Sequence, residues 1–493
     1  MSDHPLEPDA TTLHAWIDAF ARFTTDHVAR LPDMPAQGLA TPKARARAHE
    51  VSTPIGEQPL PGGIAAITER LDQAAEASLL APGPGYLAYV PGGGLPSAAI
   101  ADLVAGLLNR YTGLAAAAPA FVRLEADVLQ WLAQSFGYGT DAHGLLCSGG
   151  SMANLCAVIT ARSERLGDDA DLRKATVYTS DQAHHSVAKA VRLAGVPAGN
   201  VHAVAVDDRL RLVPGALAER VAADRRAGQL PFLVVSAAGS TNTGAIDPLH
   251  ALADLCATEG LWHHVDGAYG GAFVLCDEGR RRLAGIERAD SVTFDPHKGM
   301  FLPYGTGCLL VRDGAALRRA HGGDAAYLQD FDLHHDALAP SPADYGPELS
   351  RPFRGLRLWL PLMLHGAAAF REALAEKLAL ADHFHDGLQR MIAANAPIEI
   401  VDRPQLSTVP FRLRRESDEP LAAYNDRNAA WLSAINARGH VYLSSTALPV
   451  ADGDAFTLRV CVLSFRTHRE HIDRALDDVA QTSSGVSSTS RSR

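Results

Sequence analysis

Cysteine is scarce in this sequence, and its spacing suggests neither a cross-linked nor a metal-bound framework. Six cysteines are scattered over 493 residues, and no two of them form a CxxC pair. This spacing argues against structural zinc and against a disulfide-stabilised fold, and we expect no other bound metal. Because most of the cysteines lie in apolar segments, buried and reduced thiols in a cytoplasmic protein are the simplest interpretation.

Long apolar runs and basic blocks are missing as well. No apolar run reaches the roughly 18 residues of a membrane-spanning helix, so we expect no association with a membrane. The segment Met1–Pro5 lacks a basic region followed by an apolar one, so we expect no signal peptide. The formal net charge of −11 argues against nucleic-acid binding as the main function.

The chain is long enough for two or three domains, since a typical domain has roughly 100–200 residues. Residues 1–80 are predicted to form an N-terminal arm. Within it, residues 11–30 have helical periodicity, whereas residues 31–61 look extended and irregular. An arm with so little core of its own is expected to pack on another surface, such as a second subunit.

Residues 81–366 alternate short apolar strands with helical segments, which predicts a mostly parallel sheet covered by helices on both faces. The expected strands are 175–178, 201–206, 232–237, 263–265, 291–294 and 306–311. The expected helices are 216–227, 249–259 and one that the segment 147–154 opens and that runs to residue 162. Residues 367–480 are predicted to form a smaller α+β domain, and residues 481–493, which are poor in apolar side chains, a disordered tail.

An aspartate and a lysine stand at the ends of two expected strands, where sites in such sheets lie. Asp266 follows the strand 263–265, and Lys298 follows the strand 291–294 in the sequence Asp295-Pro296-His297-Lys298. A lone lysine there is usually solvated, and a lone aspartate usually caps a turn. Together, however, a lysine can bind an aldehyde and an aspartate can keep a pyridine nitrogen protonated. The pair therefore indicates pyridoxal phosphate (PLP) acting as an electron sink.

Other segments could complete such a site. The glycine-rich segment 147–154 opens a helix whose free N–H groups suit a phosphate, although a capped helix without a ligand is the commoner case. His184 could stack on a pyridine ring, and its neighbour His185 leaves open which of the two acts. The hydroxyls of residues 240–244 could bond a cofactor or only form a turn. The long polar segment 322–350 is typical of a lid.

The sequence resembles the fold-type I, PLP-dependent amino acid decarboxylases of group II, which include aromatic amino acid, tyrosine, glutamate and 2,4-diaminobutyrate decarboxylases. The motifs are SDQAHHSV, HVDGAYGG and DSVTFDPHKG, supported by SGGSMAN and LSRPFRGLRLW, and the resemblance covers about residues 10–480. It implies an α/β, aspartate aminotransferase-like large domain with a mostly parallel seven-stranded sheet, a smaller α+β C-terminal domain and an N-terminal helical arm. It also implies a homodimer with the active site at the subunit boundary.

The resemblance implies decarboxylation of an L-amino acid to an amine and carbon dioxide. Lys298 would form a Schiff base with PLP, and Asp266 would pair with the pyridinium nitrogen. His184 would stack on the ring and face the substrate carboxylate. Tyr327, on the expected lid, would return a proton to Cα after carbon dioxide has left.

The remaining cofactor contacts implied by the resemblance come from five residues: Gly150, Ser151, Thr241, Ala268 and His297. Gly150, Ser151 and His297 would hold the phosphate, Ala268 would pack beside the ring, and Thr241 would lie near both cofactor and substrate. The expected substrate pocket comprises Tyr89, Pro91, Gly92 and Arg351, although the role of Arg351 stays open.

Four positions depart from the family pattern, and one of them is His185, which replaces a small residue common in relatives. Asp295 stands where many animal relatives have Asn, and we leave it out of the phosphate contacts because an anion is unfavourable there. Gly113 and Ala115 stand where aromatic relatives carry large aromatic side chains. The small residues either enlarge the pocket or let another segment fill it.

The substrate side chain stays open, with an aromatic amino acid slightly favoured because Tyr89 fits one. Acidic or dibasic amino acids, such as glutamate and 2,4-diaminobutyrate, are alternatives. Oxidative decarboxylation to an aldehyde is another, although the retained Tyr327 favours simple decarboxylation because the family's aldehyde synthases often have Phe there. The retained site residues argue against a non-catalytic binding protein, and the missing GxGxxG motif argues against a dinucleotide-dependent oxidoreductase.

Overall fold

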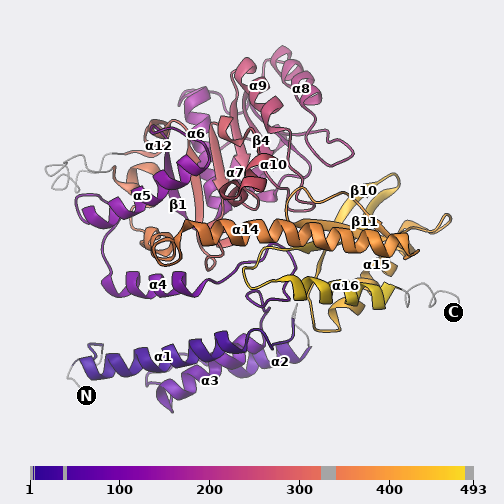
Figure 1. Cartoon of the computed structure of the whole chain (residues 1–493). Coiled ribbons are helices and arrows are strands. Elements are labelled where there is room, and N and C mark those ends of the chain that lie inside the picture. Colours follow the sequence, from indigo (N-terminus) through magenta and orange to yellow (C-terminus); the bar gives the residue numbers. More distant parts are fainter. Residues whose placement is uncertain (1–3, 5, 37–41, 324–339, 484–493) are drawn as a thin grey trace.

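The computed structural model describes residues 4, 6–36, 42–323 and 340–483. They form an N-terminal helical arm, a large α/β domain and a smaller α+β domain (Figure 1), in agreement with the fold class expected from the sequence. Within these residues, no helix combines the length and apolarity needed to cross a bilayer.

The arm consists of α1 (Ala10–Arg30), α2 (Pro42–Val51) and α3 (Gly63–Glu76), which lie apart from the two domains in Figure 1. The Asp9 side chain caps α1 by accepting the N–H of Thr12 at 2.7 Å. No residue of α1 is buried. The prediction that residues 31–61 are irregular is wrong at α2, where Pro42 occupies the first helical position, a place that tolerates proline.

The large domain is built on a seven-stranded sheet with the order β1-β7-β6-β5-β4-β2-β3. Its strands are β1 (His143–Cys147), β2 (Ala175–Ser180), β3 (Val201–Val204), β4 (Leu230–Ala237), β5 (Trp262–Asp266), β6 (Ser291–Phe294) and β7 (Gly307–Val311). Neighbours from β3 to β6 are parallel, whereas β7 runs antiparallel to both β6 and β1. The parallel strands therefore end at one common edge.

Helices cover both faces of this sheet, as βα alternation requires. In β4, Leu233 and Val235 pack toward the face covered by α6, α7 and α12, whereas Val234 packs toward α8 and α9. The other face also carries α5 and the start of α14. The helices of the domain are α4 (Pro96–Leu108), α5 (Pro119–Ser135), α6 (Gly150–Leu166), α7 (His185–Leu193), α8 (Pro214–Arg226), α9 (Leu249–Glu259), α10 (Asp277–Arg282), α11 (Pro296–Gly299) and α12 (Gly314–His321), with short 3-10 turns η1 (Ala198–Asn200), η2 (Gly271–Leu275), η3 (Ile286–Arg288) and η5 (Pro342–Tyr345).

The smaller domain has a four-stranded antiparallel sheet with the order β10-β11-β9-β8. Its elements are β8 (Ile398–Ile400), β9 (Thr408–Leu413), α15 (Leu421–Asn436), β10 (Ser444–Val450), β11 (Gly453–Cys461) and α16 (Arg469–Ser483). Helix α16 includes residues 481–483, which the sequence assigned to a disordered tail. The rest of that predicted tail lies outside the described residues.

The long helix α14 (Gly355–Ala393) joins the two domains, and Figure 1 shows it crossing from one to the other. Its first part packs on α4 and α5, and its second part packs on α16, β8 and β9. Gly366 interrupts the helix with φ 72° and ψ 158°. Gly366 is also the last residue of the predicted large domain, and that boundary stays a prediction.

Candidate active site

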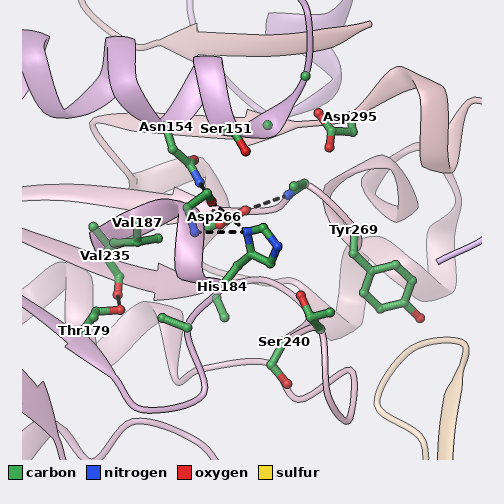
Figure 2. Close-up of a pocket in the computed structure, with 18 of the residues that line it drawn as sticks. Ser151, Asn154, Thr179, His184, Val187, Val235, Ser240, Asp266, Tyr269 and Asp295 are labelled. Carbon is green, nitrogen blue, oxygen red and sulfur yellow. Dashed lines mark hydrogen bonds between the residues drawn. The ribbon is translucent and has the colours of Figure 1, made fainter. Parts of the chain in front are cut away.

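A cavity of about 310 Å³ lies where the parallel strands of the large sheet end. Figure 2 shows side chains from α6, β5 and the segments after β2, β4 and β6 converging on it. All eight residues predicted to contact PLP line this cavity: Gly150, Ser151, His184, Thr241, Asp266, Ala268, His297 and Lys298. The structure thus brings them together, and their contacts with a cofactor stay a prediction.

Lys298 lies on α11, the single helical turn that follows β6. Its Nζ is 2.9 Å from Oδ2 of Asp295, whose carboxylate is only 2% exposed. The other oxygen of Asp295 is buried with no hydrogen-bond partner among the residues that the structure describes. The buried carboxylate of Asp295 therefore holds the amine of Lys298 at the cavity wall. Lys298 is the only lysine that lines this cavity.

Asp266 is the last residue of β5, and both of its carboxylate oxygens are held. Oδ1 accepts the backbone N–H of Ala268 at 3.0 Å, and Oδ2 accepts the side-chain amide of Asn154 at 2.9 Å. These two hydrogen bonds fix the orientation of the carboxylate. Asp266 can therefore pair with a protonated ring nitrogen.

The first turn of α6 forms the part of the cavity wall beside Asp295 and Ala268. Its N-cap is Gly149, which has no side chain to cap the helix, and the first N–H groups of a helix have no partner within it. A Cβ at Gly150 would lie 3.0 Å from Oδ2 of Asp295 and 3.1 Å from Cβ of Ala268, so a larger residue would crowd the cavity. Free N–H groups beside the Ser151 hydroxyl fit a phosphate.

His297 lines the same wall. Its Nδ1 lies 2.6 Å from the carbonyl oxygen of Thr306. Because a carbonyl oxygen only accepts, Nδ1 must carry a proton and donate it there. Nε2 is then the nitrogen that is left to face the cavity. Burial lowers the pKa of His297, partly offset by Asp295. His297 can therefore donate to a phosphate oxygen only in a protonated form that burial opposes.

His184 stands at the N-cap of α7, directly after β2. Its Nδ1 accepts the backbone N–H of Ser186 at 3.3 Å and lies 2.7 Å from the Ser186 hydroxyl. Burial lowers its pKa, against the opposing effect of Asp266, so the ring is neutral at neutral pH. The ring of His185 lies beside it at 4.2 Å between centroids, but His184 lines the cavity and His185 does not, which supports the prediction that His184 is the one that acts.

The hydroxyl-rich segment after β4 has both of the properties considered from the sequence. Ser240 and Thr243 bond each other at 3.1 Å and the N–H of Ala245, which makes a turn. Ser240 and Thr241 also line the cavity.

The expected substrate-pocket residues do not line this cavity. Tyr89 is 44% exposed, and its N–H donates to the hydroxyl of Ser444. A Cβ at Gly92 would lie 2.8 Å from the ring of Tyr304, so the segment containing Pro91 and Gly92 packs on the chain that follows Lys298. These residues lie near the site without reaching the described cavity.

Arg351 lies in the interior, away from the cavity. Its Nη1 is 2.7 Å from Oε1 of Glu125 on α5, and its Nη2 lies 3.4 Å from the carbonyl oxygen of Leu146 on β1. Oε2 of Glu125 accepts the N–H of Gly355 at 3.0 Å. Arg351 therefore packs behind β1 and does not line the described cavity, and its place in a substrate pocket stays a prediction.

Gly113 and Ala115 also fall outside the cavity lining. A Cβ at Gly113 would collide with the carbonyl oxygen of Leu349, and the N–H of Ala115 donates to the hydroxyl of Ser341. The segment 341–349 thus occupies the space beside them, which is the second of the two alternatives drawn from the sequence. Tyr327 lies outside the described residues.

The sequence indicated no role for Asn154 and argued against Asp295 as a phosphate contact, yet both line the cavity and contact its charged groups. Asn154 bonds Asp266, and Asp295 pairs with Lys298. Each belongs to a motif quoted above, SGGSMAN or DSVTFDPHKG. Asn154 follows Gly150 by one helical turn, and Asp295 precedes Lys298 by one, and this spacing could have identified both as site residues.

Comparison with known proteins gives consistent matches over most of the chain. The model of the pyridoxal-dependent decarboxylase conserved domain matches residues 82–414. Aromatic-L-amino-acid decarboxylase of Bacillus atrophaeus is 35% identical over 389 residues, 79% of each chain. Phenylacetaldehyde synthase of Petunia hybrida is 30% identical over 413 residues, 80% of this chain and 79% of the relative. The crystal structure of Oryza sativa TDC with PLP and tryptamine has a TM-score of 0.87 at 27% identity and covers 98% of this chain and 99% of its own.

Proposed function

This chain belongs to the pyridoxal-dependent decarboxylase family, and we propose that it converts an aromatic L-amino acid to the corresponding amine and carbon dioxide. The observation that carries the proposal is the meeting of Lys298, Asp266 and His184 at one cavity. The aromatic side chain is supported by the relative of 35% identity, which is named for aromatic L-amino acids.

Different residues of the cavity would bind and orient different parts of the cofactor and the substrate. The N-terminus of α6 with Ser151 would hold the phosphate of PLP, and Asp266 would keep its pyridine nitrogen protonated. Bound PLP supplies an electron sink for the electron pair that remains at Cα when carbon dioxide leaves. Lys298 supplies the amine that carries the cofactor, and we propose Tyr327 as the residue that returns the proton to Cα.

His184 is suited to the substrate carboxylate because it is neutral and its Nδ1 is occupied by Ser186. Its Nε2–H is then free to donate to a carboxylate oxygen. Thr241 lines the cavity after the neighbouring strand β4 and would contact cofactor and substrate.

We also propose a homodimer in the cytoplasm. The arm supports it, because Trp16 and Phe20 of α1 remain 43% and 37% exposed, an unusual state for large apolar side chains of one helix. The six cysteines are all buried free thiols, which suits a reducing compartment. A variant that lacks residues 1–60 should be insoluble, or monomeric and inactive, and a soluble, fully active monomer would contradict the proposal.

The activity is tested by screening the common L-amino acids for carbon dioxide release with added PLP. Borohydride reduction followed by peptide mass mapping should find the cofactor attached to Lys298, and the Lys298→Ala variant should lose both the label and turnover. Active protein with Lys298 unlabelled would refute the assignment.

The same screen addresses the alternatives. Release of carbon dioxide mainly from glutamate or 2,4-diaminobutyrate would replace the aromatic substrate by an acidic or dibasic one. The similarity to phenylacetaldehyde synthase supports a second candidate, oxidative decarboxylation to an aldehyde. Hydrogen peroxide and aldehyde formed together with carbon dioxide would identify it.

A further inference from the structure

One side-chain amide, that of Asn154 on α6, connects the two polar groups that flank the cavity. Its Nδ2 lies 2.9 Å from Oδ2 of Asp266 and 3.1 Å from the hydroxyl of Ser186. That hydroxyl lies 2.7 Å from Nδ1 of His184. Figure 2 shows Asn154 directed at Asp266, with the His184 ring beside them and its second nitrogen toward the open cavity.

The carbonyl oxygen of Asn154 is held from inside the sheet. It lies 3.1 Å from Nε2 of His264 on β5, whose Nδ1 lies 2.8 Å from the hydroxyl of Ser291 on β6. The indole N–H of Trp262 donates to the same hydroxyl at 2.8 Å. Six side chains from four elements therefore form one continuous chain of hydrogen bonds from Trp262 to His184.

The chemistry of the Asp266 end fixes the direction of the hydrogen bonds. Because the Asp266 carboxylate only accepts, Nδ2 of Asn154 must face it, and this excludes the flipped amide. The Asn154 carbonyl then accepts the Nε2–H of His264, so Nδ1 of the neutral His264 ring accepts the Ser291 hydroxyl. That hydroxyl can also accept the indole N–H of Trp262, because it has two lone pairs and one proton.

The branch to His184 follows from the same orientation. The second N–H of Asn154 donates to the Ser186 hydroxyl, which then donates to Nδ1 of His184. The backbone N–H of Ser186 also points at this nitrogen at 3.3 Å, and an N–H can only donate. Nδ1 of His184 therefore has no proton, and the proton of the neutral ring is on Nε2.

Burial keeps this chain in one state. His264 and Asn154 are each 1% exposed, and Ser186 is 2% exposed. Burial lowers the pKa of His264 to about 4, against the opposing effect of Asp266, so His264 is neutral at neutral pH. In a dry interior each unmade hydrogen bond is costly, so the network favours a single arrangement.

We propose that Asn154 is a positioning residue for the decarboxylation: its amide locks the Asp266 carboxylate in place and, through Ser186, fixes the proton of His184 on the nitrogen that faces the substrate. The inference rests on the proposed function of this site. It predicts two separable branches. Loss of Asn154 should affect both cofactor binding and turnover, whereas loss of the Ser186 hydroxyl should affect mainly turnover.

The test compares Asn154→Ala, Asn154→Ser and Ser186→Ala with a control on the same helix, Thr160→Val. Thr160 is fully buried and hydrogen-bonded to the Cys156 carbonyl, but it does not line the cavity. The dissociation constant of PLP is measured by absorbance without substrate, the melting temperature of each apoprotein by calorimetry, and kcat and KM by carbon dioxide release.

Both Asn154 variants should bind PLP about 10- to 100-fold more weakly than the wild type, the range expected for one hydrogen bond to a charged group. Ser186→Ala should keep the dissociation constant within threefold and lower kcat more than it changes KM, and Ser186→Thr should restore kcat. Thr160→Val should bind PLP like the wild type. If Asn154→Ala does not fold, Asn154→Ser decides.

PLP affinity within threefold of the wild type in the Asn154 variants would overturn the proposal. An equal weakening in Ser186→Ala would overturn the separation into two branches, and with it the assignment of Asn154 as their junction. Wild-type protein that binds no PLP and releases no carbon dioxide would instead refute the proposed function itself, so the two failures are distinguishable.

Discussion

Replacing Glu125 by Ala should destabilise the protein without acting on the site directly. The carboxylate and the Arg351 guanidinium are 3% and 1% exposed and lie 2.7 Å apart. Removing one partner of such a pair leaves the other charge buried, which costs about 3–5 kcal/mol. We expect the lower end, about 3 kcal/mol, because Nη1 of Arg351 has no well-aligned hydrogen bond among the described residues.

The expected shift in melting temperature follows from the chain length. At about 2.1 cal/mol/K per residue, 493 residues have an unfolding entropy of about 1 kcal/mol/K, so a loss of about 3 kcal/mol lowers the melting temperature by about 3 °C. Calorimetry of the apoprotein measures it. The double variant Glu125→Leu, Arg351→Met should recover most of the loss, since an apolar pair often replaces a buried ion pair at little cost.

Two results would refute this reasoning. The first is a double variant as unstable as the sum of its single variants, which would mean that the two side chains are not coupled. The second is a double variant that melts like the wild type but has a KM raised more than tenfold. That outcome would indicate that Arg351 contributes to binding the substrate.

Three further outcomes are expected at single positions. Asp266→Ala should lower kcat at least 100-fold while part of the PLP stays bound, as measured by carbon dioxide release and absorbance; near-normal turnover would contradict the pairing with the pyridine nitrogen. Gly150→Ala should weaken PLP binding about tenfold, since its Cβ would lie 3.0 Å from Asp295; unchanged affinity would contradict the phosphate position. Below pH about 6.5 a histidine of the unfolded chain takes up a proton, whereas folded His264, with a pKa lowered to about 4, stays neutral. The free energy of unfolding should therefore decrease as the pH is lowered between these values, by up to about 1.4 kcal/mol per pH unit. A His264→Gln variant with the same slope in urea titrations would contradict this.

Local patterns predicted the frame of the fold closely. Helix α9 begins and ends where its periodicity placed it. Strand β5, which ends at Asp266, and strand β6, which precedes Lys298, lie within one residue of their expected positions. Strand β10 was not expected, because Ala and Pro are depleted in strands and this strand depends on pairing with β11. Helix α2 was read as irregular because proline, which ends helices elsewhere, stands at its first residue.

The parts of the site that the sequence did not reveal depend on contacts between distant residues. Asn154 meets Asp266 across 112 positions, and Arg351 meets Glu125 across 226. Neither pairing has a periodicity or a local spacing that marks it. Residues next to a strand end could be placed by topology, whereas their partners became visible only once α6 and α5 had docked on the sheet.

Helix α14 links the two domains through two helical segments that meet at Gly366. An α-helix turns by about 100° for every residue, so one residue inserted or deleted within either segment would turn the side chains beyond it away from the elements on which they pack. Gly366 itself holds a backbone conformation with φ 72°, which side chains other than glycine adopt at a cost. Changes in chain length should therefore be accepted in the surface loops long before they are accepted in this helix.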